Sequence, residues 1–384
     1  MKIFLFVTTY QLIIGLYPTF GSSVVSQNND CIQYDNKERI ITISCVNPVH
    51  LSDLNNKLQA PDVLDRQGVG LNESWILNAG ITIEAGSTFV IDSTDTNWLK
   101  IIADGKHAYP ITVLGSLVID SVKITSWNPK TQDYAKFKKV LRPVTEDQIT
   151  DIDKMLRPYI KIEDETTGTT NVTNSELAYL GYDCEAGCSG LSYYGSNGTS
   201  IIKNNELHHN RFGFYSAGGA GNIILENNYV HHNFMYGFDP HTGTHDMLIK
   251  NNTLHDHGAQ GIICSLDCHN ITIEGNKVSR SDGSGIMFSR NMSGSVARNN
   301  VVHDESKCIF LSQSHNNEVY NNTVSNCARQ GIYLYHNSFE NKIYNNTIGN
   351  STENILVSDD SKDNEITSNT IIGQKENETQ KDNG

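Results

Sequence analysis

Short runs of alternating apolar and polar residues, separated by asparagine and glycine turns, fill most of this 384-residue sequence. The runs recur as a unit of 22–24 residues, for example in IILENNYVHHN and MLIKNNTLHDH. Alternation with a period of two predicts β-strands, and no unit carries a convincing amphipathic helix. A repeated unit of this length, built from short strands, is typical of one coil of a parallel β-helix. We therefore expect an all-β protein with a right-handed parallel β-helix.

Two landmarks fix how the coils align. The first is a turn asparagine, found at Asn205, Asn228, Asn252, Asn276, Asn300, Asn322, Asn346 and Asn369. The second is a small residue before an apolar one, found at Gly213, Gly237, Gly261, Gly285, Cys308 and Gly331. Stacked coils lie about 4.8 Å apart, so the asparagine side chains are expected to form a ladder.

The remaining segments define the domain organisation. Residues 1–23 have the lysine, apolar run and small residues of a signal peptide. Residues 24–373 are expected to form one β-helix domain, with a basic loop inserted at 128–157 that carries Lys136, Lys138 and Lys139. The polar tail at 374–384 is expected to be disordered. We therefore expect a secreted, cell-surface or periplasmic monomer without a membrane span after signal cleavage.

Charge narrows the range of partners. The chain has 29 Lys and Arg against 43 Asp and Glu, a formal net charge of −14. Such a balance argues against nucleic acid, which needs clustered cations. An anionic sugar chain as partner would require a local concentration of cations instead.

Eight cysteines fit an exported protein with disulfides. Proximity in sequence suggests the pairs Cys31–Cys45, Cys184–Cys188, Cys264–Cys268 and Cys308–Cys327. A metal site of Cys184, Cys188, Cys264 and Cys268 is the alternative, although their spacing is looser than in a usual zinc knuckle. Sequons for N-glycosylation occur at Asn72, Asn171, Asn197, Asn251, Asn270, Asn291, Asn321, Asn345, Asn350 and Asn377.

Histidines recur three or four places after the turn asparagine. They are His208, His209, His231, His232, His255 and His303. Stacking of the coils would align them, either as a hydrogen-bonded turn ladder or as a metal-binding strip. The ladder is the favoured interpretation, so no metal site is predicted.

One coil departs from the repeat, at residues 236–241, Tyr-Gly-Phe-Asp-Pro-His. Alignment on the glycines places Phe238 and Pro240 in the core, so Asp239 and His241 are expected on one exposed outer face. Tyr215 lies one coil before Asp239, and Ser265 lies one coil after His241. A proline removes a strand donor, which suggests a locally distorted strand that serves a site.

The hexamer YGFDPH resembles the signature of the mannuronan C5-epimerases. The resemblance extends over much of residues 75–350, through WILNAGITI, the ITSW that ends at Trp127, SELAYLGYD, HHNRFGFY, GIICS and GIMFSR. It implies C5-epimerisation of mannuronate to guluronate in an alginate-like polyuronate. In that family the motif histidine removes the C5 proton, a tyrosine or water reprotonates the opposite face, and a cation neutralises the carboxylate.

The resemblance assigns roles to residues of this chain. His241 becomes the base, Tyr236 a candidate acid, and Asp239 a residue that positions the substrate or orients the histidine. The bacterial periplasmic branch usually has an acidic residue after the motif histidine and an arginine after the serine of the next coil. Here those positions hold Thr242 and Leu266.

The carboxylate-neutralising cation must therefore come from elsewhere, and Arg290 is favoured over Arg211. Further contacts to the substrate are expected from Tyr215, Ser265 and the inserted Lys136, Lys138 and Lys139. No cofactor is predicted; calcium stays open, but no motif indicates it.

Other functions stay open at this point. A polysaccharide lyase begins with the same proton abstraction and differs when the C4 leaving group departs. A non-catalytic glycan-binding β-helix and a copper-site maturation protein of similar repeat are the non-enzymatic alternatives. The Asp239 and His241 pair favours an enzyme, the missing arginine at position 266 favours a binder, and the lack of Met/His clustering disfavours the copper role.

Overall fold

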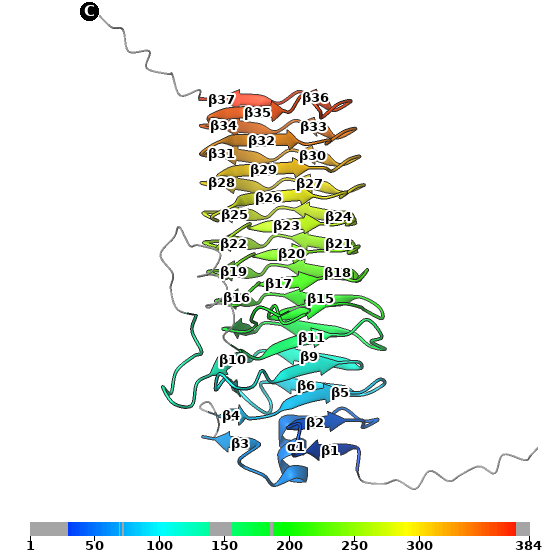
Figure 1. The fold of residues 1–384 in the computed structure, drawn as a ribbon, viewed down its shortest axis with the longest axis vertical. Coiled ribbons are helices and arrows are strands. Elements are labelled where there is room, and N and C mark those ends of the chain that lie inside the picture. The colour runs from blue at the N-terminus through cyan, green and yellow to red at the C-terminus, as the bar shows by residue number, and fades with distance from the viewer. Residues whose placement is uncertain (1–29, 69, 71–72, 138–155, 185–186, 374–384) are drawn as a thin grey trace, which may run out of the picture. The chain divides into compact units, whose positions relative to one another are not determined.

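The computed structural model describes residues 30–373, except 69, 71–72, 138–155 and 185–186. Within these residues three long sheets run the length of a stack of coils (Figure 1). The predicted parallel β-helix is confirmed. The signal peptide, the polar tail, and Lys138 and Lys139 of the insertion lie outside the described residues.

Each coil contributes one strand to each of three sheets, which we call A, B and C. Sheet A contains β1 (Ile32–Asp35), β2 (Ile40–Ile43), β5 (Gly80–Ile83), β8 (Pro110–Val113), β11 (Tyr159–Ile162), β14 (Leu191–Tyr193), β17 (Phe214–Ser216), β20 (Phe238–Pro240), β23 (Ile262–Ser265), β26 (Ser284–Ser289), β29 (Lys307–Ser312), β32 (Gln330–Tyr335) and β35 (Glu353–Val357). Sheet B contains β6 (Thr88–Asp92), β9 (Ser116–Asp120), β12 (Thr170–Thr173), β15 (Ser200–Lys203), β18 (Gly221–Glu226), β21 (His245–Lys250), β24 (His269–Glu274), β27 (Val296–Arg298), β30 (Glu318–Tyr320), β33 (Lys342–Tyr344) and β36 (Glu365–Thr367). Sheet C contains β3 (Leu64–Gln67), β4 (Ser74–Leu77), β7 (Trp98–Ile102), β10 (Lys123–Trp127), β13 (Glu176–Ala178), β16 (Glu206–His208), β19 (Tyr229–His231), β22 (Thr253–His255), β25 (Lys277–Ser279), β28 (Val301–His303), β31 (Thr323–Ser325), β34 (Thr347–Gly349) and β37 (Thr370–Ile372).

The first end of the solenoid is closed by elements that the repeat did not predict. Helix α1 (Leu51–Leu58) buries Leu51 and Leu54 against the first coils. The Asp53 carboxylate accepts the His50 backbone N–H at 2.9 Å, which satisfies a donor just before the helix. Strands β1 and β2 pair antiparallel, as do β3 and β4, whereas the later strands pair parallel. These elements cover the strand edges that an open solenoid would expose.

The interior confirms both predicted landmarks. The turn asparagines from Asn205 to Asn346 are buried, and the Nδ2 atom of Asn228 donates to Oδ1 of Asn252 at 2.9 Å, a contact repeated along the stack. Each asparagine thus satisfies buried polar groups of the next coil. A Cβ atom at Gly237 would lie well under 3.0 Å from the Gly261 carbonyl oxygen, which explains the glycine at this turn.

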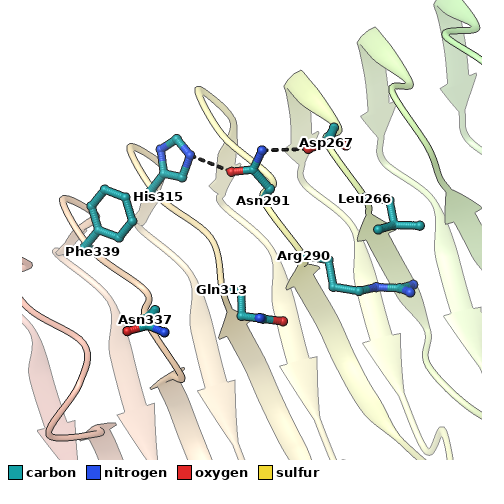
Figure 2. A pocket seen from close by; sticks show the side chains of 8 residues that line it. All are labelled: Leu266, Asp267, Arg290, Asn291, Gln313, His315, Asn337 and Phe339. Atoms are coloured by element: carbon teal, nitrogen blue, oxygen red, sulfur yellow. Dashed lines mark hydrogen bonds between the residues drawn. The ribbon is translucent and has the colours of Figure 1, made fainter.

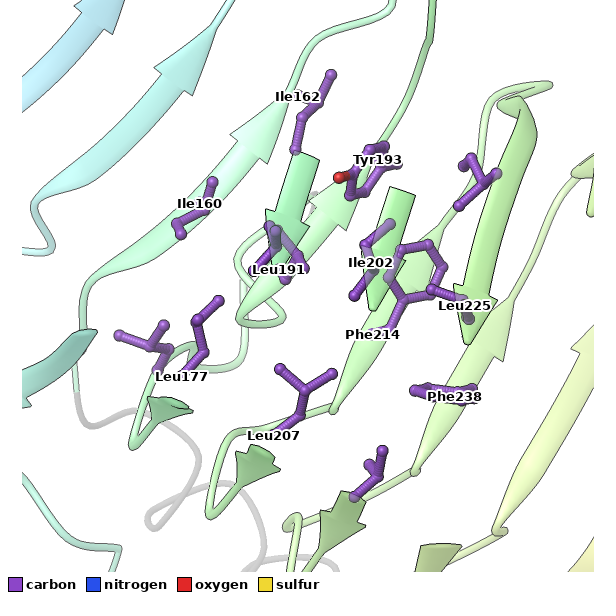
Figure 3. Packing of buried hydrophobic residues seen from close by; sticks show 14 of the residues in the cluster. Ile160, Ile162, Leu177, Leu191, Tyr193, Ile202, Leu207, Phe214, Leu225 and Phe238 are labelled. Atoms are coloured by element: carbon purple, nitrogen blue, oxygen red, sulfur yellow. The ribbon is translucent and has the colours of Figure 1, made fainter. Parts of the chain in front are cut away.

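Stacked apolar side chains fill the space between the three sheets. Phe214 pairs in register with Phe238, and Phe238 with Ile262, as the alignment on glycines predicted. All three are fully buried, together with Tyr193 and Leu207 from the neighbouring strands (Figure 3). Burial of apolar surface in this continuous column is the main stabilising term of a solenoid.

The inserted loop leaves the solenoid between β10 and β11, and its described ends pack on the later coils. The Tyr134 ring stacks on Tyr179 with centroids 4.4 Å apart, and the Phe137 ring lies 5.0 Å from Phe234. The fully buried Arg157 places its guanidinium 3.5 Å from the Phe137 centroid and donates to the carbonyl oxygens of Leu180 and Gly181. The insertion is therefore anchored along the turns that lead from sheet C into sheet A.

The cysteine predictions are confirmed in part. Disulfides join Cys31 to Cys45, Cys184 to Cys188, and Cys308 to Cys327. The predicted Cys264–Cys268 bond is wrong, because both are buried free thiols. Cys264 faces the core in register with Phe288, whereas the Cys268 Sγ donates to the Ser265 carbonyl oxygen at 3.0 Å. The disulfide at Cys184 and Cys188 also rules out the four-cysteine metal site.

Among the described residues, no helix has both the length and the apolar character needed to cross a bilayer.

Candidate active site

The predicted strand distortion is present at Pro240. Strand β20 pairs with β23 only at Phe238 and Ile262, and the two chains meet again at an isolated bridge between His241 and Ser265. On the other side the ladder is complete, with Tyr215 opposite Asp239. Pro240 has no N–H to donate to the ladder, whereas the backbone N–H of His241 directly after it donates to the Ser216 carbonyl oxygen at 2.8 Å.

His241 is held by one partner on each ring nitrogen. Its Nε2 atom lies 3.2 Å from Nη2 of Arg290, and its Nδ1 atom lies 2.7 Å from Oγ1 of Thr242. A guanidinium only donates, so Nε2 must be the acceptor and Nδ1 must carry the hydrogen. The imidazole therefore presents a lone pair on Nε2 toward the arginine side of the site.

Electrostatics favours the neutral form of this histidine. Partial burial lowers the pKa of His241 below its ordinary value, and the positive charge of Arg290 lowers it further. A neutral imidazole with a directed lone pair can act as a base near neutral pH.

Asp239 occupies a different environment from the one predicted. The alternation rule placed it on an exposed outer face, but its side chain is only 3% exposed. That prediction is wrong, because alternation fixes the direction of a side chain and not what covers it. Burial raises the pKa of Asp239 well above its ordinary value, whereas Arg290 and Arg211 act in the opposite direction. Its Oδ1 atom forms no hydrogen bond with any described residue.

Three tyrosines line this part of sheet A. The Tyr215 ring lies 6.0 Å from the His241 ring, and the Tyr236 ring packs 5.0 Å from Phe212. Burial is the main cause of the raised pKa of Tyr236, and the charge of Asp239 adds to it. Burial also raises the pKa of Tyr215, next to Tyr194. These phenols stay protonated at neutral pH, so each is a potential proton donor.

The predicted cations are distributed unevenly. Arg290 reaches the site directly, because its Nε atom also donates to Oγ of the buried Ser265 at 2.8 Å. Arg211 pairs with Asp183 and lies close enough to Asp239 and Tyr236 to act on both electrostatically. Lys136 instead pairs with Asp133 at 2.7 Å, beside Tyr134 and over sheet C. The structure thus gathers Arg290, Ser265 and Arg211 around His241 and Asp239, but places Lys136 elsewhere.

Two surface hollows lie on either side of His241 along the stack. One extends from Arg290 toward the C-terminal coils, where His315 Nε2 contacts Asn291 Oδ1 at 2.9 Å and the Phe339 ring stacks on His315 (Figure 2). This hollow is lined by Leu266, Asp267, Arg290, Asn291, Gln313, His315, Asn337 and Phe339. The second lies over earlier coils and includes Tyr194, Gly219 and His245. Their arrangement suits an elongated ligand better than a compact one.

Sequence reasoning missed Tyr194, Lys161 and Thr242 as parts of this surface. Lys161 precedes Tyr215 by two coils in the Asp239 column, and its Nζ atom lies 5.2 Å from the Tyr194 centroid. The register of β14 with β17 also places Tyr194 in the His241 column, two coils earlier. Extending the glycine alignment back through the irregular coils could have found both residues.

The fold and the strand arrangement define a parallel β-helix with a polar site on one sheet. The family model for the right handed beta helix region matches residues 189–348 and 241–380. The chain belongs to this right-handed β-helix family, which confirms the predicted handedness. No curated protein matches the sequence significantly.

Solved structures share the fold. The periplasmic alginate epimerase AlgG superposes with a TM-score of 0.74 at 21% identity, over 87% of this chain and 85% of that chain. The A-module of the Azotobacter vinelandii mannuronan C-5 epimerase AlgE4 gives 0.53 at 16% identity, over 78% of this chain and 86% of that chain. At these identities the likeness establishes the fold alone.

Proposed function

We propose that this protein is an exported mannuronan C5-epimerase, which converts mannuronate to guluronate residues within a polyuronate chain. The observation that carries the proposal is the contact between His241 Nε2 and Arg290 Nη2. It brings a neutral base and a permanent cation to one point, and removal of the proton next to a carboxylate requires both. The fold shared with alginate epimerases supports the substrate class. Three disulfides support export to an oxidising compartment.

The proposed reaction begins with the substrate carboxylate displacing His241 from the Arg290 guanidinium. The cation neutralises the carboxylate, which makes the C5–H bond acidic enough to break. The freed Nε2 lone pair takes the C5 proton, and the two electrons of that bond delocalise into the carboxylate as an enolate. Thr242 holds the opposite ring nitrogen, so the imidazole keeps its orientation.

Reprotonation from the opposite face completes the inversion. Tyr236 is the proposed donor, because its phenol is largely buried beside Asp239 and keeps its proton at neutral pH. His241 then releases its proton to solvent, and the Tyr236 phenolate takes up a proton from solvent. Asp239 acts as a positioning residue below the two arginines and the tyrosines. Tyr215, Ser265 and Arg211 complete the contacts to the sugar.

A polymer passing through the site would occupy the two hollows that flank His241. Neither hollow alone carries the cations expected for a polyanion. Lys136, Lys138 and Lys139 of the insertion therefore remain proposed as an additional, salt-sensitive contact at a distance from His241.

The test is incubation of polymannuronate with the protein in D2O, followed by proton NMR. An epimerase produces guluronate that carries deuterium at C5. Polymannuronate recovered from the wild-type protein without deuterium and without guluronate would contradict the proposal. A lyase would give unsaturated uronate ends with their ultraviolet absorbance. His241→Gln should lower the rate by about 10²–10⁴-fold, the usual loss for a general base. His303→Gln on sheet C is the matched control and should keep wild-type activity.

A further inference from the structure

Two columns of side chains run side by side along the outer rim of sheet C. The first column follows the strand register through His208, His231, His255, Ser279, His303 and Ser325. The second consists of the residue after each of these, and every member has a positive φ, at His209, His232, Asp256, Arg280, Asp304 and Asn326. A left-handed residue directly after a strand places its side chain beside the preceding one, so each coil forms a rung of two side chains.

The contacts divide the four rungs that begin with a histidine into two kinds. His255 pairs with Asp256 at 2.6 Å and His303 with Asp304 at 2.7 Å, which is the hydrogen-bonded ladder that the sequence favoured. In the other two rungs histidine faces histidine. The Nδ1 atoms of His208 and His209 lie 2.7 Å apart, and those of His231 and His232 lie 2.9 Å apart.

A glutamate accompanies each histidine–histidine rung. Glu176 Oε1 lies 3.0 Å from Nε2 of His208, and Glu206 Oε1 lies 2.9 Å from Nε2 of His231. An ionised carboxylate only accepts, so in both rings Nε2 carries the hydrogen and Nδ1 keeps its lone pair. Carboxylates that orient histidines in this way are the usual outer-shell partners of metal ligands. By contrast, His255 contacts the Tyr229 hydroxyl.

We propose that His208, His209 and His231 form a binding site for a divalent transition-metal ion of the zinc type. One nitrogen atom of each lies within 4.8 Å of the others. The ligands come from two consecutive coils, because His208 and His231 stack with centroids 4.9 Å apart. Two imidazole nitrogens on a tetrahedral zinc lie about 3.3 Å apart, given metal–nitrogen bonds of about 2.0–2.1 Å. The His208–His209 pair therefore needs to open by only about half an ångström.

The chemistry of the donors selects the ion. Neutral imidazoles suit Zn²⁺, Cu²⁺ and Ni²⁺, whereas Ca²⁺ and Mg²⁺ require oxygen ligands. Three nitrogen ligands leave one position for water or another ligand.

The site is separate from the proposed active site and sits beside the insertion. His241 lies at the rim of sheet A, whereas these histidines lie on sheet C. The Tyr179 ring stacks on His209 with centroids 4.8 Å apart and is covered in turn by Tyr134. A bound ion would tie two coils together directly under the anchored end of the inserted loop.

The chain itself supplies replacements that the fold tolerates. Asn326 occupies the second column with a φ of 55°, and Ser279 and Ser325 occupy the first column. His209→Asn and His231→Ser are therefore suitable variants that should keep the fold. His303→Ser is the matched control, because His303 belongs to the first column but pairs with an aspartate.

The experiment uses the full chain without a histidine tag, stripped with a chelator and titrated with Zn²⁺ by calorimetry. Wild type and His303→Ser should bind one ion with the same affinity, and Ca²⁺ should give no heat. Glu206→Gln should weaken binding about 10–100-fold, and the two ligand variants should lose more than that. Circular dichroism checks their fold. Wild-type zinc affinity in both His209→Asn and His231→Ser, or no zinc binding by the wild-type protein, would overturn the proposal, and neither result depends on epimerase activity.

Discussion

The Nη2 atom of Arg290 lies 3.2 Å from Nε2 of His241, although the two residues are 49 positions apart in the sequence. Two coils of the solenoid separate them along the chain, and the side chain of Arg290 bridges that distance past Ser265. The mannuronan C5-epimerases that the sequence resembles would lead us to expect an arginine one coil earlier, where this chain has Leu266. The guanidinium beside His241 comes instead from the coil after Leu266.

This contact predicts a measurable change in acidity. Arg290 lowers the pKa of His241, so Arg290→Gln should raise the pKa of the imidazole because the protonated ring no longer meets a positive charge. NMR titration of the His241 ring measures this without any need for activity. Arg298→Gln serves as the control, since Arg298 pairs with Glu274 on sheet B. An unchanged His241 titration in Arg290→Gln would show that the contact is absent in solution.

The same Arg290→Gln variant should also lose most of its catalytic activity. Arg290 is proposed to neutralise the substrate carboxylate, so its loss should lower kcat/KM by about 10²–10³-fold, as for loss of one oxyanion-stabilising donor. Polymannuronate turnover by proton NMR gives the rate. A variant with a raised His241 pKa and normal turnover would leave the base in place and assign the carboxylate contact to another cation.

The variant Asp239→Asn is expected to lose activity without losing stability. Its folded pKa is raised by burial, so the stability it contributes is present at low pH and is lost as pH rises through that folded pKa. Asp239→Asn removes the cost of burying a charge, and the melting temperature at neutral pH should stay the same or rise. Activity should fall roughly 10–100-fold, because interactions with charged groups contribute about 1.5–3 kcal/mol. Asp246→Asn, at an exposed carboxylate near the start of β21, should alter neither quantity. A large loss of stability in Asp239→Asn would contradict this account.

The sequence predicted the coil register well, because a period set by Asn228 and Gly237 repeats often enough to average out local variation. It also placed Tyr215, Asp239 and Ser265 on adjacent coils correctly. It could not predict that Asp239 is buried, because alternation gives the direction of a side chain and not what packs over it. The N-terminal cap was not predicted from the sequence for a different reason. Helix α1 occurs once, so it contributes no periodic signal.

The cysteines show a second limit of sequence reasoning. Residues 264 and 268 are as close in sequence as 184 and 188, yet only the latter pair is bonded. Cys264 lies in β23 and Cys268 follows that strand, where its Sγ atom donates to the Ser265 carbonyl oxygen at 3.0 Å and is not bonded to Cys264. Proximity in sequence does not establish a disulfide, because the bond also requires a specific geometry between the two side chains.

The free thiols give a direct chemical test. Three disulfides use six of the eight cysteines, so unfolded protein kept free of reductant should react with two equivalents of thiol reagent. The native protein should react slowly, because Cys264 and Cys268 are both buried and burial raises the pKa of Cys268 to about 12. The variant Cys264→Ala should leave one equivalent. Zero equivalents in the unfolded wild type would show that the two cysteines form a fourth disulfide.

Glu305 predicts a pH dependence of stability that is independent of catalysis. It is 2% exposed, and its Oε2 atom accepts the Ser281 backbone N–H at 3.0 Å. Burial raises its pKa to about 8, against about 4.3 in an unfolded chain. The folded state therefore holds a proton that the unfolded state releases, and the stability from this group falls as pH rises from about 4.3 to about 8.

Glu305→Gln keeps an oxygen for the Ser281 bond and has no proton to lose, so its melting temperature should exceed that of the wild type at pH 8 and converge with it at pH 4. The gain is at most about 5 kcal/mol, from the pKa difference at about 1.36 kcal/mol per unit. Glu38→Gln, at an exposed carboxylate, should follow the wild-type curve, and parallel curves for Glu305→Gln and wild type across this range would show that Glu305 is ionised in the folded protein.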